Sequence, residues 1–382
     1  MISINKNNHN QLLKGAYEPA AKESSVPDFA YNPLNQTGDI YQPVIDQEWT
    51  REHAKPTWPE GKQFAVCLTH DVDAVSEINL QQNMRSIWQL ITTIPKRPLG
   101  ESLRWILIHK LNALRGLIGQ SDQLCDFEKW LDIEKQYGAR STFFFAPETV
   151  NLPHNSDCMY TYDQLVPFRG EKHTVAKLMQ IMDDEGWEIG LHPSWFAHNN
   201  VIEMISQKQQ VEAVVGHKIH SVRQHFLKYN HLETPQTQHS AGFKYDGTIG
   251  FNDNIGFRRG TSYPFHSYDL KNEEQLPLIH IPLTAQDGAL MLSEKGLRLD
   301  PDAAVKYVKL MMDAVKDVGG VLTLSWHPHT MNRPGFWNAY KSVLELLKKE
   351  DPWFATIGEV GEWWSKEVDI DLLKYTSKKE IA

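Results

Sequence analysis

Cysteine is scarce in this sequence. Its 382 residues include three cysteines, Cys67, Cys125 and Cys158, which are widely separated and form no CxxC pair. A disulfide framework is therefore not expected, which fits a reducing compartment. The first residues lack the apolar core of an export signal, and no hydrophobic run is long enough to span a bilayer. These absences predict a soluble, cytoplasmic protein without a transmembrane segment.

Basic residues are not in excess either. The chain has 39 Lys and Arg against 48 Asp and Glu, which gives a formal net charge of -9. Nonspecific binding of nucleic acid needs a basic face, so we expect no nucleic-acid partner, although a local basic pocket remains compatible with this charge. No glycine-rich phosphate-binding motif follows a predicted strand, which argues against nucleotide-binding folds.

What is present is the composition of an ordinary globular protein, 41% hydrophobic and 23% charged. Residues 1–60 are polar and proline-rich, which predicts an arm or cap without its own core. Residues 61–365 form one predicted domain with a helical insertion at about 75–125, and residues 366–382 a polar tail. The sequence leaves the oligomeric state open.

Within the predicted domain, short apolar segments alternate with segments of helical periodicity. This alternation is typical of a parallel β/α organisation, and roughly seven strands favour one barrel over two separate sheets. The predicted strands are 64–69, 139–147, 187–192, 221–227, 278–284, 320–329 and 354–358. The predicted helices are 127–137, 173–185, 202–215, 303–315 and 337–349, with a final helix after 358.

The first of these strands ends in a group of ionisable side chains. The apolar run 64–68 is followed at once by His70, Asp71 and Asp73. Alternation along an extended chain points the two aspartates to the same side. Two converging carboxylates repel each other unless a cation or a proton lies between them, so a metal site is the leading interpretation. A solvated loop after the strand is the alternative.

Histidines follow two other predicted strands in the same way. His192 ends the strand 187–192, and His327 and His329 end the strand 320–329. A single histidine after a strand is more often a hydrogen-bonded core or surface residue than a ligand. The recurrence at separate strand ends favours a shared site, because the carboxyl ends of barrel strands lie on one face.

Five short motifs, taken together, resemble the polysaccharide deacetylase superfamily. They occur in the superfamily's order and span about residues 60 to 362: Thr69–Asp73, Ser141–Phe145, Glu188–Ser194, Arg223–His225 and Leu324–His327. The match is closest to a branch with His-Asp-Val-Asp in its first motif. The resemblance implies a metal-dependent carbohydrate esterase with the NodB-homology fold, a distorted (β/α)7 barrel.

The resemblance also implies roles for individual residues. Asp71 would be the general base, Asp73 and His192 would bind the metal, Arg223 would orient Asp71, and His327 would be the general acid. Oxygen and imidazole ligands with open positions suit Zn²⁺ or a similar divalent ion. Such an ion would lower the pKa of bound water and polarise an amide or ester carbonyl.

The sequence departs from the family pattern at the third ligand. The usual second motif is His-x-x-x-His, but Phe196 stands at its second histidine. We expect His198, two residues later, to complete the metal set, with His70 and His225 as alternatives. Gln224 and His225 also replace the usual proline and aromatic residue of the third motif, which alters the pocket wall.

Other candidates concern the substrate. Trp195 and Trp326 lie next to the proposed ligands and are expected to stack on sugar rings, with buried packing as the alternative. Arg258, in a glycine-rich stretch, is expected to bind an acidic group, with a salt bridge to a nearby carboxylate as the alternative. Asp246 is a candidate for holding His327 in one tautomer, or simply a turn residue.

We therefore predict a hydrolase of carbon–nitrogen bonds other than peptide bonds, which removes an N-acetyl or other acyl group from an amino sugar. A cytoplasmic enzyme of this kind would meet precursors of a polysaccharide. One alternative is a catalytically decayed carbohydrate-binding protein on the same fold. Another is a hydrolase of a non-sugar C–N bond.

Overall fold

The fold is built around one strand whose residues are all buried. The computed structural model describes residues 9–18, 32–76, 124–148, 154 and 156–381. Within them, β1 (Ala65–Val72) is an interior strand of the sheet. It pairs in parallel with β2 (Thr142–Phe145) on one side and with β11 (Val321–Ser325) on the other. Since both faces of β1 are covered, its first half, Ala65 to Leu68, is a continuous apolar run, and polar side chains begin at Thr69.

The remaining strands extend the sheet on both sides of β1. The order is β10-β11-β1-β2-β5-β6-β7-β9-β8, with β12 pairing with β1. All the pairings in this sheet are parallel except that of β8 with β9. The bounds are β5 Glu188–Leu191, β6 Ser221–Val222, β7 Tyr245–Asp246, β8 Phe265–Asp269, β9 Glu274–His280, β10 Ala285–Gln286 and β12 Trp353–Phe354.

The prediction of a parallel α/β sheet is confirmed, whereas its closure into a barrel stays a prediction, because the described strands form an open path. Its two ends are β10 and β8, and no strand pairing of the described residues joins them. Several predicted strands are shorter in the structure, because loops that carry site residues take over their last positions. The segment 221–227 is the clearest case, with two residues in β6 and the rest in a turn.

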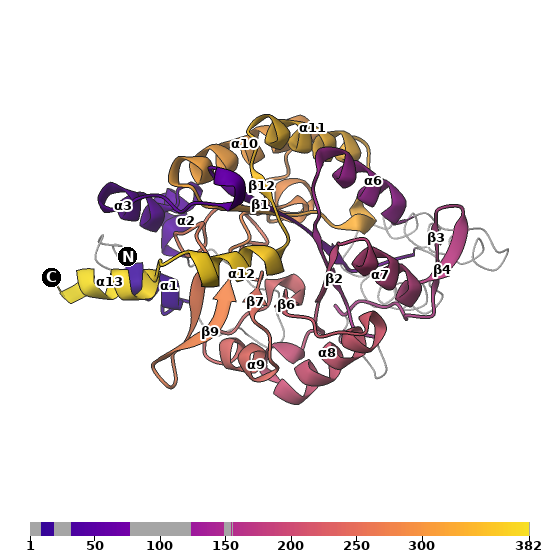
Figure 1. The fold of residues 1–382 in the computed structure, drawn as a ribbon, viewed down its shortest axis with the longest axis horizontal. Helices are drawn as coiled ribbons and strands as arrows, with labels where there is room; N and C mark the ends of the chain where they lie inside the picture. Colours follow the sequence, from indigo (N-terminus) through magenta and orange to yellow (C-terminus); the bar gives the residue numbers. More distant parts are fainter. Residues whose placement is uncertain (1–8, 19–31, 77–123, 149–153, 155, 382) are drawn as a thin grey trace, which may run out of the picture.

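Helices surround the sheet (Figure 1). Several begin at side-chain caps such as Asp126, Thr174 and Asp300, and several end at a glycine with positive φ. The helices predicted from periodicity are present, together with the short α9. Their bounds are α6 Phe127–Tyr137, α7 Val175–Asp184, α8 Val201–Val215, α9 Thr234–Ser240, α10 Pro301–Val318, α11 Phe336–Lys349 and α12 Ile357–Glu367.

A hairpin that the sequence did not predict projects beside α7. It consists of β3 (Leu165–Phe168) and β4 (Glu171–Thr174), which pair antiparallel around a turn at Arg169 and Gly170. The predicted helical insertion at about 75–125 falls mostly on residues 77–123, which lie outside the described part of the chain.

The N-terminal region contributes buried side chains to the hydrophobic core of the domain. Its elements are α1 (His9–Lys14), α2 (Pro33–Thr37) and α3 (Val44–Glu52), and Leu12, Ile40, Ile45 and Trp58 are buried in one of the two hydrophobic clusters of the domain. The tail also differs from the expectation of a polar segment. It contains α13 (Leu372–Ile381), which packs against α1 and contributes Leu372 and Leu373 to the same cluster. Both chain ends therefore lie on one side of the molecule (Figure 1).

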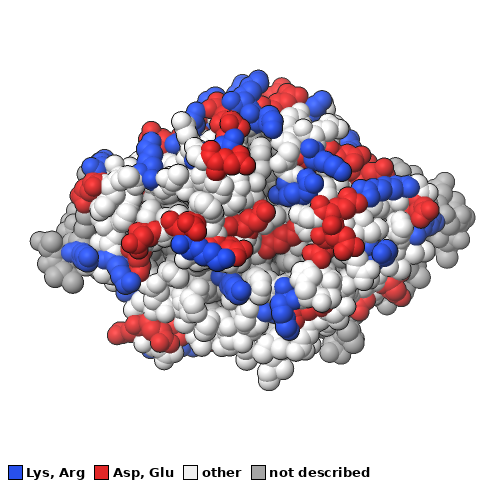
Figure 2. Space-filling model, in the orientation of Figure 1, with Lys and Arg blue, Asp and Glu red and all other residues white. Residues whose placement is uncertain are grey.

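Charged side chains lie both on the surface and in a buried ion-pair cluster. On the face that Figure 2 shows, acidic and basic side chains are interspersed. A buried ion-pair cluster meanwhile joins the N-terminal region to the domain. The Glu18 carboxylate lies 2.6 Å from Arg258 Nη2 and 3.1 Å from Arg259 Nη2.

In the described part of the chain, no helix is both long and apolar enough to cross a membrane.

We predict that Glu18→Gln lowers the free energy of unfolding by about 3–5 kcal/mol, because it leaves two buried guanidinium groups without their carboxylate. Chemical denaturation followed by tryptophan fluorescence measures this change. The matched control is Glu185→Gln, which breaks the more exposed pair with Arg169 and should cost less than about 1 kcal/mol. Equal effects of the two substitutions would contradict the structural role given to Glu18.

Candidate metal centre

The candidate site forms where the strand ends meet. Asp71 and Asp73 lie at the end of β1, His192 directly follows β5, and Arg223 directly follows β6. His327 lies two residues beyond β11. Since these strands run in parallel, their carboxyl ends face the same way and bring the five side chains together, as the sequence predicted.

Three side chains form a group that could hold a metal ion. Asp73 Oδ1 lies 3.3 Å from His192 Nε2 and 3.6 Å from His225 Nε2, and the three atoms are all within 4.8 Å of one another. Two ligand bonds of about 2.0–2.1 Å at a tetrahedral angle would place their donor atoms about 3.3 Å apart, so the residues fit a Zn²⁺-sized ion. Three protein ligands leave a position for water or substrate.

The surroundings of the two histidines suit metal binding. His192 Nδ1 donates to the Arg223 carbonyl oxygen at 2.7 Å, which turns Nε2 toward Asp73. Burial lowers the pKa of His225 to about 4, although the Asp73 carboxylate opposes this shift. His225 is therefore neutral at pH 7, the form in which imidazole binds metal.

His225 reaches Asp73 through an unusual turn. Phe226 and Leu227, which follow it, have φ angles of 55° and 51°, in the left-handed region that L-residues rarely adopt. The Phe226 carbonyl oxygen accepts a hydrogen bond from Asn252 Nδ2 at 2.5 Å. Strained backbone of this kind persists when the surroundings hold it, and it concentrates at functional sites.

Asp71 belongs to an ion pair. Arg223 Nη1 lies 3.0 Å from Asp71 Oδ1, and the same guanidinium donates to Thr69 Oγ1 and to the Gly247 carbonyl oxygen. Burial raises the pKa of Asp71, but the Arg223 charge, together with His192 and His327, outweighs it and holds the pKa below its usual value. The carboxylate is thus ionised and able to accept a proton.

His327 is oriented by a carboxylate that the sequence reasoning missed. Its Nδ1 donates to Asp287 Oδ1 at 2.5 Å, and Asp287 also accepts from the His327 backbone N–H and from Thr330 Oγ1. Burial lowers the pKa of His327, but the Asp287 charge and hydrogen bond, with Asp73 and Asp71, raise it to about 10. His327 Nε2 lies 3.9 Å from Asp71 Oδ2 and 3.8 Å from Asp73 Oδ2.

Asp287 directly follows β10, so it had the same signal as the other site residues, an acid at the end of a strand. The sequence pointed instead to Asp246 as the partner of His327. In the structure, Asp246 Oδ2 lies 2.9 Å from His280 Nδ1. This contact joins β7, which contains Asp246, to β9, which contains His280.

The structure does not bring His198 or His70 into the ligand set. His198 is buried, and its Nδ1 donates to the Trp195 carbonyl oxygen at 3.0 Å. His70 points to the other side of β1, where its two ring nitrogens contact the Trp326 carbonyl oxygen and Glu134 Oε1. Among the three histidines weighed as third ligand, His225 is the one in the group.

The three residues expected to bind substrate also lie elsewhere. Trp195 and Trp326 are only 2% and 1% exposed, so neither offers a ring face to a ligand. Their burial corresponds to the packing alternative. Arg258 is held by Glu18, as described above, which corresponds to the salt-bridge alternative.

Asp71, Asp73, His192, His225 and His327 line one cavity of about 320 Å³. Polar and apolar side chains complete its wall, and no Lys or Arg belongs to the described lining. The other lining residues are Phe226, Leu227, Asn252, Gln286, Gly288, Leu292, Ser293, His329 and Thr330. The arrangement places the ionised Asp71, the Asp73–His192–His225 group and the protonated His327 around one space.

Comparison with known proteins identifies solved structures with a similar fold. No family model matches the chain, and no curated protein matches it in sequence. Solved structures do match, each over most of its length. A Mycobacterium smegmatis protein assigned as a polysaccharide deacetylase has a TM-score of 0.51 and 19% identity, with 81% of this chain and 93% of that chain covered.

Two further structures match over a similar extent. The PuuE allantoinase has a TM-score of 0.54 and 15% identity, over 86% of this chain and 98% of that chain. A Pseudomonas aeruginosa PAO1 protein, also assigned as a polysaccharide deacetylase, has a TM-score of 0.52 and 14% identity, over 86% and 99%. The chain therefore shares the α/β fold of these three structures.

Proposed function

We propose that this protein is a metal-dependent hydrolase that removes an N-acetyl or other acyl group from an amino sugar of a polysaccharide or its precursor. One observation carries the proposal: Asp73, His192 and His225 converge at one cavity that Asp71 and His327 also line. Arg223 pairs with Asp71, and Asp287 pairs with His327. The polysaccharide deacetylase assignment of two structures with the same fold supports it.

Asp73, His192 and His225 would hold the divalent ion. When bound, such an ion polarises the acyl carbonyl and acidifies water. Asp71 is the base in this scheme. It is close to the ligands but paired with Arg223, so its carboxylate stays ionised and takes the proton of the attacking water.

His327 is the acid in this scheme. Asp287 accepts from Nδ1, which leaves the proton on Nε2 directed toward the two aspartates. With its pKa raised to about 10, the ring is protonated at neutral pH and can donate to the leaving amine. The pKa of Asp71 is lowered and that of His327 is raised, and two groups whose pKa values differ in this way are a common acid–base arrangement.

A second candidate is the hydrolysis of a non-sugar C–N bond, and the similarity to the allantoinase favours testing it. A substrate panel that compares N-acetylated sugars with small cyclic and linear amides separates the two reactions. Release of acetate from the sugars alone supports the proposal. Turnover of the amides alone supports the second candidate. A protein that retains the metal but turns over neither class would correspond to a decayed, binding-only site.

The two aspartates should respond differently to substitution. We expect Asp71→Asn to retain the metal and to lower kcat by about 10²–10⁴-fold, because it removes the general base. Asp73→Ala should lose both metal and activity, because it removes a ligand. Metal content by elemental analysis, together with deacetylation rates, measures both effects. Retention of metal in Asp73→Ala would contradict the ligand assignment.

The third ligand can be tested with a matched pair of histidines. His225→Ala should weaken metal binding beyond the roughly 10–100-fold that loss of an outer-shell partner costs. His198→Ala, which removes a nearby buried histidine outside the ligand group, should change metal affinity by less than about tenfold. Competition with a chromophoric chelator measures both affinities. The reverse order of effects would restore His198 as the ligand.

The pH dependence should reveal the role of Asp287. As an acid, His327 is active when protonated, so activity falls as pH rises through its pKa. Asp287→Asn removes the largest influence that raises this pKa and should move the alkaline limb of the kcat profile to lower pH. Thr330→Val, which removes another hydrogen bond to Asp287 but no charge, is the control and should move the limb less. An unshifted limb in Asp287→Asn would assign the acid to another group.

A further inference from the structure

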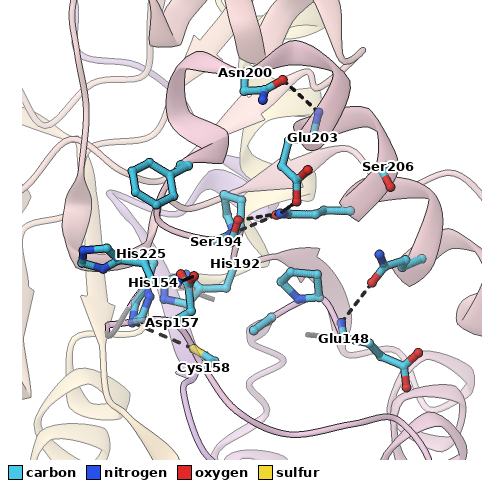
Figure 3. Close-up of a pocket in the computed structure, with 16 residues that line it drawn as sticks. Glu148, His154, Asp157, Cys158, His192, Ser194, Asn200, Glu203, Ser206 and His225 are labelled. Carbon is cyan, nitrogen blue, oxygen red and sulfur yellow. Dashed lines mark hydrogen bonds between the residues drawn. The ribbon is translucent and has the colours of Figure 1, made fainter. Parts of the chain in front are cut away.

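A second cavity adjoins the candidate metal centre. It measures about 450 Å³, and His192 and His225 belong to the walls of both cavities. Figure 3 shows Glu148, Asp157 and Glu203 around this space. We call this cavity, defined by the 16 residues that line it, the side chamber. Its size is within the range of ligand sites in proteins.

One wall of the side chamber is a polar face of α8. Glu203, Ser206, Gln207 and Gln210 line the cavity. Their spacing of three, four and seven residues puts them on one side of the helix. Gln207 is buried although its side chain is polar. Glu203 and Ser206 are exposed, so this polar face borders both the cavity and solvent, where it can form hydrogen bonds with a ligand.

Hydrogen bonds fix this wall to the metal-site loop. Gln207 Oε1 accepts from the Ser194 backbone N–H, and Gln207 Nε2 donates to Ser194 Oγ and to Glu203 Oε1. Ser194 is two residues after the ligand His192. The position of Glu203 is thereby tied to that of the metal centre, so a ligand in the side chamber would be held at a defined distance from the reacting group.

The charges of the side chamber have one sign. Glu148, Asp157 and Glu203 line it, and its described lining contains no Lys or Arg. Asp157 uses both oxygens on backbone N–H groups. Glu148 accepts from the Tyr162 N–H and Glu203 from Gln207, with one oxygen each. Among the described residues, each of these two side chains has one carboxylate oxygen without a hydrogen bond, and the chamber favours a cation.

An aromatic ring is available at the same cavity. Phe196 lines the side chamber and is 49% exposed, unlike the neighbouring buried Trp195. Lys228, the cation near these rings, lies 3.9 Å from the centroid of Trp195 and 5.6 Å from that of Phe196, and does not line the chamber. An exposed ring beside carboxylates and amides suits a sugar ring that carries a positive charge.

We propose that the side chamber binds a sugar residue with a free amine, adjacent to the residue that is deacylated. The preferred substrate would then be an amino-sugar oligosaccharide that is already partly deacylated. This inference rests on the proposed function and specifies its substrate. Deacylation of an amino sugar releases an amine, so an earlier turnover on the same chain would supply the group that the chamber recognises.

The test compares two tetramers of equal length, one of glucosamine and one of N-acetylglucosamine. Their binding to the metal-loaded Asp71→Asn protein is measured by calorimetry, so that turnover does not interfere. We expect the glucosamine tetramer to bind at least about tenfold more tightly, as expected for a charge-assisted hydrogen bond. Its affinity should fall with added salt, whereas that of the neutral tetramer should not.

Substitutions test whether the carboxylates of the side chamber account for the tighter binding of the glucosamine tetramer. Adding Glu203→Gln, alone and with Glu148→Gln, should weaken binding of the glucosamine tetramer by about tenfold and change binding of the neutral tetramer less than about twofold. Glu367→Gln, at the exposed end of α12, is the matched control and should change neither. The salt dependence of the parent protein tests the proposal without these variants, should they fold poorly.

The outcomes of these experiments distinguish failure of the side-chamber inference from failure of the proposed function. Equal affinities for the two tetramers, or equal losses on substituting Glu203, would overturn the side-chamber inference. The proposed function would still stand if the native protein released acetate from N-acetylated sugars. Failure of the native, metal-loaded protein to deacylate any acetylated sugar would instead overturn the proposed function, and the substrate assignment with it.

Discussion

The repulsion between two neighbouring carboxylates is the constraint on which this site depends. Asp71 and Asp73 lie at the buried end of β1 and line the same cavity. Without compensation, two such groups cannot both stay ionised. Arg223 compensates Asp71, and the imidazoles of His192 and His225, with the ion they would hold, compensate Asp73. These partners follow two other strands, His192 after β5 and both Arg223 and His225 after β6, so the charges can balance only once these strands have paired.

The opposite side of β1 helps to fix the direction of these aspartates. His70 alternates with Asp71 and points away from the cavity, where it contacts Glu134. Glu134 is fully buried, and it also accepts from Ser141, Trp187 and Tyr340. A buried carboxylate with this many donors is satisfied, so the network anchors β1 from behind. Because β1 cannot rotate without breaking these bonds, Asp71 and Asp73 keep facing the metal centre.

The sequence predicted the parts of this site that follow a periodic rule. Apolar runs located β1, β2, β5 and β11, and polar residues just after three of them pointed to Asp71, Asp73, His192 and His327. His225 was only an alternative, because its position depends on positive φ angles at Phe226 and Leu227 that no periodicity encodes. Asp287 was missed because β10 is only two residues long, and Trp195 was placed in the substrate site because exposure cannot be read from a local pattern.

The pairing of β1 has a consequence for how the chain acquires its structure during synthesis. β1 lies early in the sequence, yet two of its three partners are β11 and β12, with Ala65 opposite both Val321 and Trp353. Contacts between segments so far apart form late, because a long intervening chain must first be closed into a loop. A nascent chain that has emerged only as far as α9 therefore contains the two aspartates and His225 but lacks two of the strands that flank β1. The pairing of β1 with β11 and β12 can therefore be completed only after residues 353–354 have left the ribosome.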